Sequence, residues 1–211
     1  MRKKSQLVCG VGINDSPDPV VKEVTIDGKR VTLWRCPFYT RWNGMIQRCY
    51  SLREKKRNPT YLDCVCVPEW HYFTNFKSWM EKQDWQGKEL DKDLLKLGNK
   101  VYGPDTCLFV NKEVNLFMTE NKLLKGQYPV GVSYSKGNNK FKARCWNFEI
   151  GKQEYLGYFD TEEEAHAAWL EFKLLQAKTL ASKQTDIRIA KALIDRYESY
   201  KINLDVRADL P

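Results

Sequence analysis

The sequence contains no hydrophobic run long enough to cross a membrane and no cysteine pair spaced for a zinc site. A membrane span needs about 20 consecutive apolar residues, and the basic start of the chain leads into no apolar signal-peptide segment. The 7 cysteines form no CxxC pair, so we expect neither a disulfide framework nor a structural zinc site, although CVC at 64–66 leaves half a metal site open. These absences predict a soluble, intracellular protein with no membrane partner and with reduced, buried cysteines.

The charge of the chain is unbalanced towards the basic side. Lys and Arg number 35 against 27 Asp and Glu, which gives a net charge of +8. Such a balance favours a polyanionic partner, with nucleic acid as the first candidate. The basic run REKKR at 53–57 is either a solvated loop or a phosphate contact. The 211 residues, 42% of them hydrophobic, suffice for one ordinary domain or two small ones.

Apolar residues recur at strand and helix spacing in the first half of the chain. Residues 24–34 alternate around an Asp-Gly pair and predict a hairpin. Residues 38–50 and 70–80 predict two helices whose apolar faces form a core. His71 is the only histidine in this half, and such a position is more typical of a packed or surface residue than of a catalyst. His71 would serve as a base only if the fold brought it to Asp91.

Polar residues gather in the segment 90–115, LDKDLLKLGNKVYGPDTCLFVNKEVN. Asp91 follows a short apolar run, Asn99 lies in a Gly-Asn loop, and Asn115 ends the segment. A strand, a loop and a short helix would bring Asp91 and Asn115 together as oxygen ligands for Mg²⁺ or Mn²⁺. Because Asp, Asn and Gly are also the commonest turn formers, helix caps and a tight turn are the alternative interpretation.

This segment resembles the HNH (His-Me finger) endonuclease motif of phage and homing enzymes. YGPDTCLFV at 102–110 matches the YxPxTCxFV pattern of such phage proteins, and similar motifs extend over about residues 10–115. The resemblance implies a treble-clef-like nuclease module over residues 1–118. It also implies a phage protein that acts in the cytoplasm of an infected bacterial host.

The resemblance assigns roles to individual residues of the segment. Asp91 opens the motif and, with Asn115, would hold the metal ion. Lys92 stands where the family has its general-base histidine. The implied catalytic residues are Asp91, Lys92 and Asn99, with His71 as the substitute base.

The pattern changes in the second half of the chain. Short runs at 130–132, 141–148 and 154–159 predict a β meander, and Asp160-Thr161 precedes a helix with an acidic first turn. The organisation predicted from these signals is a linker at 119–127, a three-stranded antiparallel sheet with a packed helix at 128–181, and a C-terminal helix and tail at 182–211.

This half is similar to the plant ethylene-response-factor (APETALA-type) DNA-binding domain. The similarity lies in PVGVSYS, KFKARCW and YLGYFDTEEEAHAAW. It implies that the exposed face of the sheet enters the major groove of double-stranded DNA. Period-two alternation independently places Phe141, Ala143 and Cys145 on the opposite, core side. The implied DNA-binding residues are Ser133, Ser135, Lys140, Lys142, Arg144, Trp146, Gln153 and Tyr155.

Together the two resemblances imply an α+β, phage-type, DNA-binding HNH-like endonuclease that cleaves or nicks DNA with Mg²⁺ or Mn²⁺. One alternative is a catalytically inactive DNA-binding protein, or a protein that inhibits a host system, which has lost its base. Another is an interaction module whose basic sheet binds an acidic protein partner.

Overall fold

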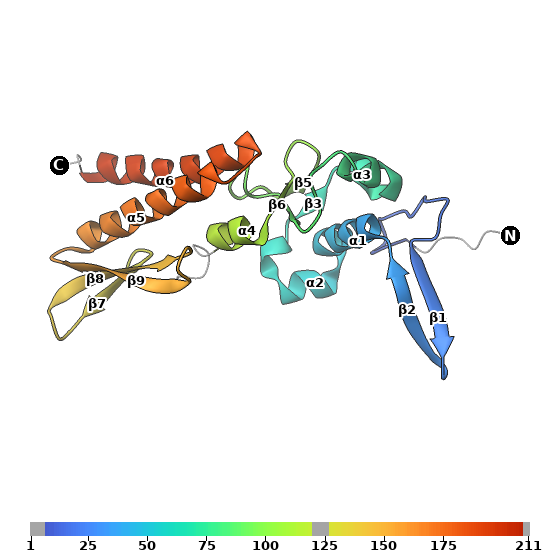
Figure 1. Ribbon diagram of the computed structural model, residues 1–211, viewed down its shortest axis with the longest axis horizontal. Helices are drawn as coiled ribbons and strands as arrows, with labels where there is room; N and C mark the ends of the chain where they lie inside the picture. The colour runs from blue at the N-terminus through green and yellow to red at the C-terminus, as the bar shows by residue number, and fades with distance from the viewer. Residues whose placement is uncertain (1–6, 120–126, 209–211) are drawn as a thin grey trace. The chain divides into compact units, whose positions relative to one another are not determined.

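The computed structural model describes residues 7–119 and 127–208, and the side chains of these as far as residue 200 (Figure 1). The fold is α+β, as expected. The chain divides into two compact units, a first unit of Met1–Asn111 and a second unit of Lys112–Pro211. Among the helices of the described ranges, none is long and apolar enough to cross a membrane.

The described part of the first unit combines short helices with two-stranded sheets. β1 and β2 form an antiparallel hairpin, β3 pairs with β5 in parallel, and β4 pairs with β6 antiparallel. The strands are β1 (Val21–Ile26), β2 (Lys29–Arg35), β3 (Val65–Cys66), β4 (Glu89–Asp91), β5 (Val101–Tyr102) and β6 (Leu108–Val110). The helices are α1 (Pro37–Tyr50), α2 (Leu52–Arg57), α3 (Phe73–Met80) and the 3-10 helices η1 (Pro59–Tyr61) and η2 (Pro68–His71).

The core of the first unit lies between α1 and α3. α1 has Pro37 in its first turn, where the missing N–H costs nothing, and buries one face at helical spacing. The fully buried Trp42 on that face donates its indole N–H to the Trp70 carbonyl at 2.7 Å. The ring of Trp70 in turn packs against Phe76 of α3, with ring centroids 5.0 Å apart. This aromatic cluster is the core that the sequence predicted.

The helix expected over 70–80 is shorter than predicted. η2 ends at His71, Tyr72 is extended, and α3 begins only at Phe73. The cause is a bridge from the N-terminal region, because the Ile13 N–H donates to the His71 carbonyl and the Ile13 carbonyl accepts from the Phe73 N–H. This long-range pairing overrides the helical pattern of the local sequence.

The hairpin of β1 and β2, which we call the ribbon, is exposed on both of its faces. The Asp27-Gly28 turn has positive φ at both residues, as a tight hairpin turn requires. Side chains of the row Val24, Val31 and Ile26 remain between 37% and 53% exposed. The ribbon therefore packs against no other described element along most of its length.

The second unit contains a helix, a three-stranded sheet and two long helices. The sheet has the order β7-β8-β9 and is antiparallel throughout. In Figure 1 the long helices lie on one side of this sheet. The elements are α4 (Lys112–Thr119), β7 (Val132–Ser135), β8 (Lys140–Asn147), β9 (Lys152–Phe159), α5 (Glu162–Ser182) and α6 (Ile187–Ala208).

α5 begins where the sequence places its cap. The Thr161 hydroxyl accepts from the Glu164 N–H, and the Glu164 carboxylate accepts from the Thr161 N–H. This reciprocal capping box satisfies two of the backbone donors that a helix start leaves unpaired. α5 extends to Ser182 and α6 begins at Ile187, so the C-terminal helix starts later than the predicted residue 182.

The boundary between the units differs from the expected one at residue 118. α4 belongs to the second unit because its buried Phe117 packs against Phe148 and Tyr197, with ring centroids 5.1 and 5.5 Å apart. The start of the expected linker at 119–127 is the last residue of α4. Residues 120–126 of that linker lie outside the described ranges.

Candidate nucleic-acid interface

The sheet of the second unit places the predicted DNA-binding residues on one face. Cross-strand pairs join Ser135 to Lys140, Ser133 to Lys142, Arg144 to Tyr155, and Trp146 to Gln153. Directly paired residues project to the same side of a sheet, so these four pairs share one face. We call this surface the sheet face. It also includes Tyr158, which pairs with Lys142.

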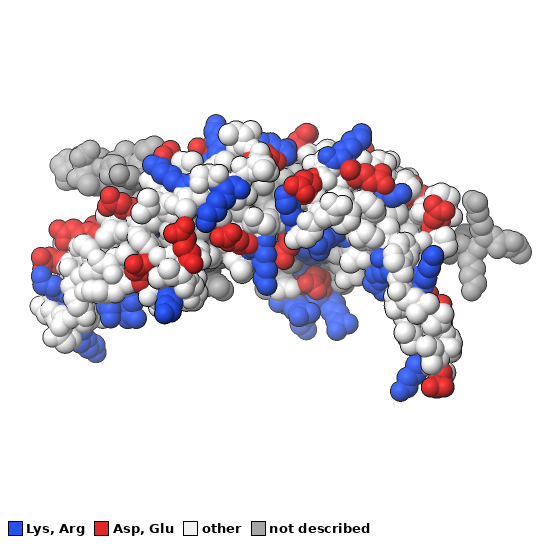
Figure 2. Space-filling model, viewed as in Figure 1, with Lys and Arg blue, Asp and Glu red and all other residues white. Residues whose placement is uncertain are grey.

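The opposite side of the sheet packs against α5. Ala143 and Cys145 are buried there, while Arg144 and Trp146 between and beside them are exposed. Gln176 of α5 reaches this layer, accepting from the Phe148 N–H at 2.9 Å. Figure 2 shows Lys and Arg side chains along the side of the sheet that the helices leave uncovered. The period-two prediction is therefore confirmed for Ala143 and Cys145, whereas Phe141 is only half-buried.

A β-bulge in β9 places Tyr158 on the sheet face, a position that the sequence pattern did not predict. Ala143 pairs with Gly157 whereas Arg144 pairs with Tyr155, so Leu156 is the extra residue. The bulge shifts the alternation by one and puts both Tyr155 and Tyr158 on the sheet face, with ring centroids 5.4 Å apart. Gly157 inside the strand, at φ 138°, is the sequence signal that could have located the bulge.

Lys142 occupies the centre of the sheet face. Its Nζ lies 5.6 Å from the ring centroid of Tyr155 and 5.9 Å from that of Tyr158. Aromatic faces attract a cation at such distances and limit its rotamers. Lys140, at the edge, forms an exposed ion pair with Asp160 at 2.9 Å, which neutralises part of its charge. Lys142 and Arg144 are thus the cations most available to a ligand.

A close backbone contact fixes the sheet on its helix. Gly131 has φ +84°, and a Cβ built there would lie 2.1 Å from Cδ1 of Trp169 in α5. His166 stacks on Trp169 with ring centroids 5.4 Å apart and donates from Nδ1 to the Val130 carbonyl at 2.9 Å. The start of β7 is therefore held directly against the first turns of α5.

In the first unit, Asp91 caps the turn that follows β4. Its Oδ1 accepts from the backbone N–H of Asp93 at 2.7 Å and of Leu94 at 2.6 Å. Burial is the largest cause of the raised pKa of Asp91, because it disfavours the ionised carboxylate. These contacts match the turn-and-cap alternative for this segment.

Lys92 and Asn99 close the same loop. Lys92 is 5% exposed, and its ammonium pairs with the Asp93 carboxylate at 2.6 Å and donates to the Asn99 carbonyl at 2.6 Å. The Asn99 side chain donates to the carbonyls of Lys92 and Val101 at 2.9 and 2.7 Å. The structure brings Asp91, Lys92 and Asn99 together, but in a network whose hydrogen bonds are internal to the loop.

His71 lies in a different cluster. Its Nε2 is 3.1 Å from the Tyr50 hydroxyl, which is also 3.6 Å from the Cys66 sulfur. Burial raises the pKa of Tyr50 to about 12. Hydrogen bonding, first from the Cys49 thiol and then from Tyr50, lowers the pKa of Cys66. Within the described ranges His71 makes no hydrogen bond to Asp91, and its contacts are those of a packed residue.

The residues proposed for a divalent metal do not fit Mg²⁺ or Mn²⁺. These ions prefer near-octahedral oxygen coordination, usually from one or two carboxylates completed by waters or substrate phosphates. Asp91 already accepts two backbone hydrogen bonds, and the neighbouring ammonium of Lys92 would repel a cation. Asn115 is on α4 and belongs to the second unit. Within the described ranges no three His, Cys, Asp or Glu side chains are grouped to hold a metal ion.

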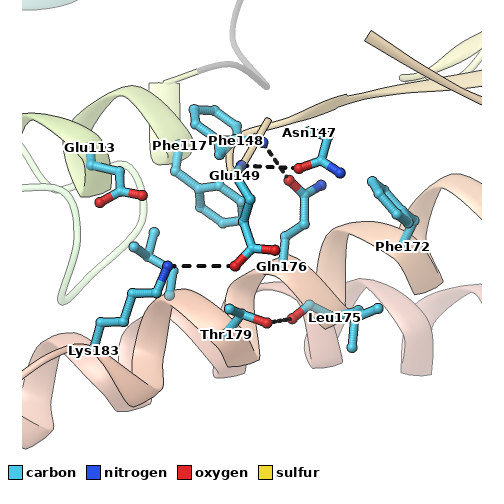
Figure 3. A pocket seen from close by; sticks show the side chains of 11 residues that line it. Glu113, Phe117, Asn147, Phe148, Glu149, Phe172, Leu175, Gln176, Thr179 and Lys183 are labelled. Atoms are coloured by element: carbon cyan, nitrogen blue, oxygen red, sulfur yellow. Dashed lines mark hydrogen bonds and ion pairs between the residues drawn. The ribbon is translucent and has the colours of Figure 1, made fainter. Parts of the chain in front are cut away.

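A cavity of about 160 Å³ lies in the second unit between α4, α5 and the end of β8 (Figure 3). Phe117 and Phe148 contribute rings to its wall, and Lys183 pairs with Glu149 at 3.5 Å beside it. The fully buried Lys173 places its Nζ 4.0 Å from the ring centroid of Phe117 and 4.7 Å from that of Phe148. Ligand pockets usually measure about 300 to 1,000 Å³, so this space is a gap in packing rather than a ligand site.

The sheet face is the best-formed candidate site in the described ranges. It combines two cations with three exposed aromatic rings on a rigid scaffold, whereas the loop of Asp91 is closed upon itself. Comparison with known proteins adds no relative to this description, because no protein-family model, no curated protein and no solved structure matches the chain.

Proposed function

We propose that this protein binds double-stranded DNA through the sheet face of its second unit. The single observation that supports this most is the grouping of Lys142 and Arg144 with Trp146, Tyr155 and Tyr158 on the side of the sheet that α5 leaves uncovered. The net charge of +8 favours the same class of partner.

The chemistry of the face suits a groove of DNA. A guanidinium such as that of Arg144 can donate two parallel hydrogen bonds to guanine O6 and N7, and an ammonium can neutralise a phosphate. The aromatic side chains Trp146 and Tyr155 are 41% and 51% exposed. Exposed aromatic rings are unfavourably hydrated, and contact with the sugars and base edges of DNA would remove this apolar surface from water.

A binding titration with matched variants tests this proposal. The double variant Lys142→Ala/Arg144→Ala should reduce the slope of log K against log salt by about 2, because each lost phosphate contact changes it by about 0.9. If Arg144 reads a base, Arg144→Ala alone should cost about 1 to 3 kcal/mol on a preferred sequence and less on mixed DNA. The control is Lys178→Ala/Lys191→Ala on α5 and α6, which removes the same charge away from the sheet face.

The alternatives predict different outcomes. An acidic-protein partner predicts that wild type binds a poly-glutamate peptide at least as tightly as duplex DNA. Equal DNA affinity for wild type and the Lys142/Arg144 double variant would refute the sheet face as the DNA-binding surface. Quenching of Trp146 fluorescence by duplex DNA, lost in Trp146→Phe, is the direct optical signature of the proposed contact.

For the first unit we propose an HNH-like module with weak or no cleavage activity. Hydrolysis of a phosphodiester needs a base, which contributes about 100-fold to 10,000-fold. The Lys92 ammonium pairs with the Asp93 carboxylate at 2.6 Å and donates to the Asn99 carbonyl at 2.6 Å, so it is engaged within its own loop and not presented to a water nucleophile. The catalytically inactive or host-inhibitory alternative is therefore the better supported one for this unit.

A further inference from the structure

α2 carries three positive charges on one exposed face, an arrangement that destabilises the helix itself. Arg53, Lys56 and Arg57 are exposed and lie at i, i+3 and i+4, so they share one helix face. Like charges at this spacing destabilise a helix by a few tenths of a kcal/mol per pair. The only acid on α2, Glu54, is engaged elsewhere, since it accepts from the Asn58 side chain at 2.6 Å. Within the described ranges these three cations form no ion pair.

Two further lysines converge on the turn that follows α2. Lys55 donates to the Leu62 carbonyl at 2.7 Å, and Lys100, the residue before β5, donates to the Thr60 carbonyl at 3.0 Å. Both ammonium groups are thereby held beside η1. We define the α2 patch as Arg53, Lys55, Lys56, Arg57 and Lys100. Figure 2 shows Lys and Arg side chains gathered over the region of α2.

Arg48 adds a preorganised cation at the adjoining end of α1. Its guanidinium carbon lies 6.0 Å from the ring centroid of Tyr61 and 5.4 Å from that of Tyr102. Its Nε is buried and has no hydrogen-bond partner among the described residues. A buried donor without a partner costs about 1 to 3 kcal/mol. The first unit thus concentrates cations around α2 and η1 with a deficit of acceptors.

We propose that the α2 patch is a second nucleic-acid contact, which binds the phosphates of double-stranded DNA. It rests on the proposed function and extends it to the first unit. Phosphate oxygens carry the negative charge that would offset the repulsion among Arg53, Lys56 and Arg57. They are also strong hydrogen-bond acceptors for these cations. The patch has no exposed aromatic platform of its own, so it should contribute affinity and salt dependence rather than sequence preference.

The test uses the full chain and a fluorescein-labelled mixed-sequence duplex. The triple variant Arg53→Ala/Lys56→Ala/Arg57→Ala should reduce the slope of log K against log salt by about 2 to 3, at 0.9 for each lost phosphate contact. The matched control, Lys178→Ala/Lys183→Ala/Lys191→Ala, removes the same formal charge from α5, from its C-cap residue and from α6. Circular dichroism of each variant confirms that its fold is retained.

Each result decides a separate question. A triple α2 variant with the same salt slope as the control triple would overturn the α2 patch, while a reduced slope in Lys142→Ala/Arg144→Ala would still support the sheet face. A normal slope in the sheet variant with a reduced slope in the α2 variant would support the patch and refute the sheet face. Tight binding of poly-glutamate peptide that is lost in the α2 variant would assign the patch to an acidic protein and overturn the nucleic-acid contact.

Discussion

Replacing Phe117 should destabilise the second unit strongly, although the sequence places this residue beside a linker. Its side chain is fully buried against Phe148 and Tyr197, and its ring face lies 4.0 Å from the Lys173 ammonium. Truncation of a buried Phe to Ala costs about 3 to 5 kcal/mol. A desolvated cation–π contact adds up to about 2 kcal/mol. The sum is a large fraction of the roughly 5 to 15 kcal/mol that stabilises a typical domain.

The measurement is urea unfolding of the full chain, with hydrogen exchange used to assign the loss to residues 140–182. Leu116→Ala is the matched control, because Leu116 precedes Phe117 on the same helix and is 53% exposed. Its effect should stay within about 0.5 kcal/mol. Two fragments test the same point, because they differ in whether they contain α4 with Phe117. The fragment Lys112–Pro211 should unfold cooperatively, and the fragment 127–211 should not. A Phe117→Ala variant as stable as Leu116→Ala would refute the assignment of α4 to the second unit.

Three further predictions concern the loop of Asp91 and the seat of the sheet. Asp91→Ala should destabilise the protein by about 1 to 3 kcal/mol, because it leaves the N–H groups of Asp93 and Leu94 without an acceptor, whereas Asp91→Asn keeps an acceptor. Because burial raises the pKa of Asp91 in the folded state, the stability of the wild type should fall as pH rises through that raised pKa. Asp91→Asn should lack this pH dependence in urea titrations. In plasmid assays with Mg²⁺ or Mn²⁺, wild type should nick weakly or not at all. Lys92→His should nick more, because it removes the ammonium that repels a metal ion beside Asp91 and supplies the missing base. Wild-type nicking that survives Asp91→Ala would place the chemistry elsewhere. Gly131→Ala should lower the melting temperature because its Cβ would meet Trp169 at 2.1 Å, while Gly137→Ala, with nothing within 4 Å, should not.

The sequence predicted the elements whose signals are local. The turn residues Asp27 and Gly28 located the ribbon, and Thr161 with Glu164 located the start of α5. Alternation of Ala143 with its neighbours separated the two faces of β8. In each case the physical determinant lies within a few residues of its effect, so one chain is enough to identify it.

What the sequence did not predict depends on partners distant in the chain. The bridge of Ile13 to Tyr72 interrupts a helical pattern from 59 residues away, counting from 13 to 72. The packing of Phe117 against Tyr197 transfers α4 to the second unit in a similar way. At the candidate metal site, Asp91 and Lys92 have the residue types of a catalytic motif, but whether their polar atoms are free depends on loop hydrogen bonds that no residue pattern reveals.

The ribbon has a consequence for how this protein behaves at high concentration. In a sheet of two strands each strand is an edge, so β1 and β2 both present backbone N–H and C=O groups that could pair with another molecule. The ribbon also has exposed apolar side chains, including Leu33 at 63%. Its charged residues Lys22, Glu23, Lys29 and Arg30 are the kind that discourage edge-to-edge pairing. Because salt screens such repulsion within a few ångströms at about 1 M, concentrated protein should remain dispersed in dilute buffer and self-associate through the ribbon as the ionic strength rises.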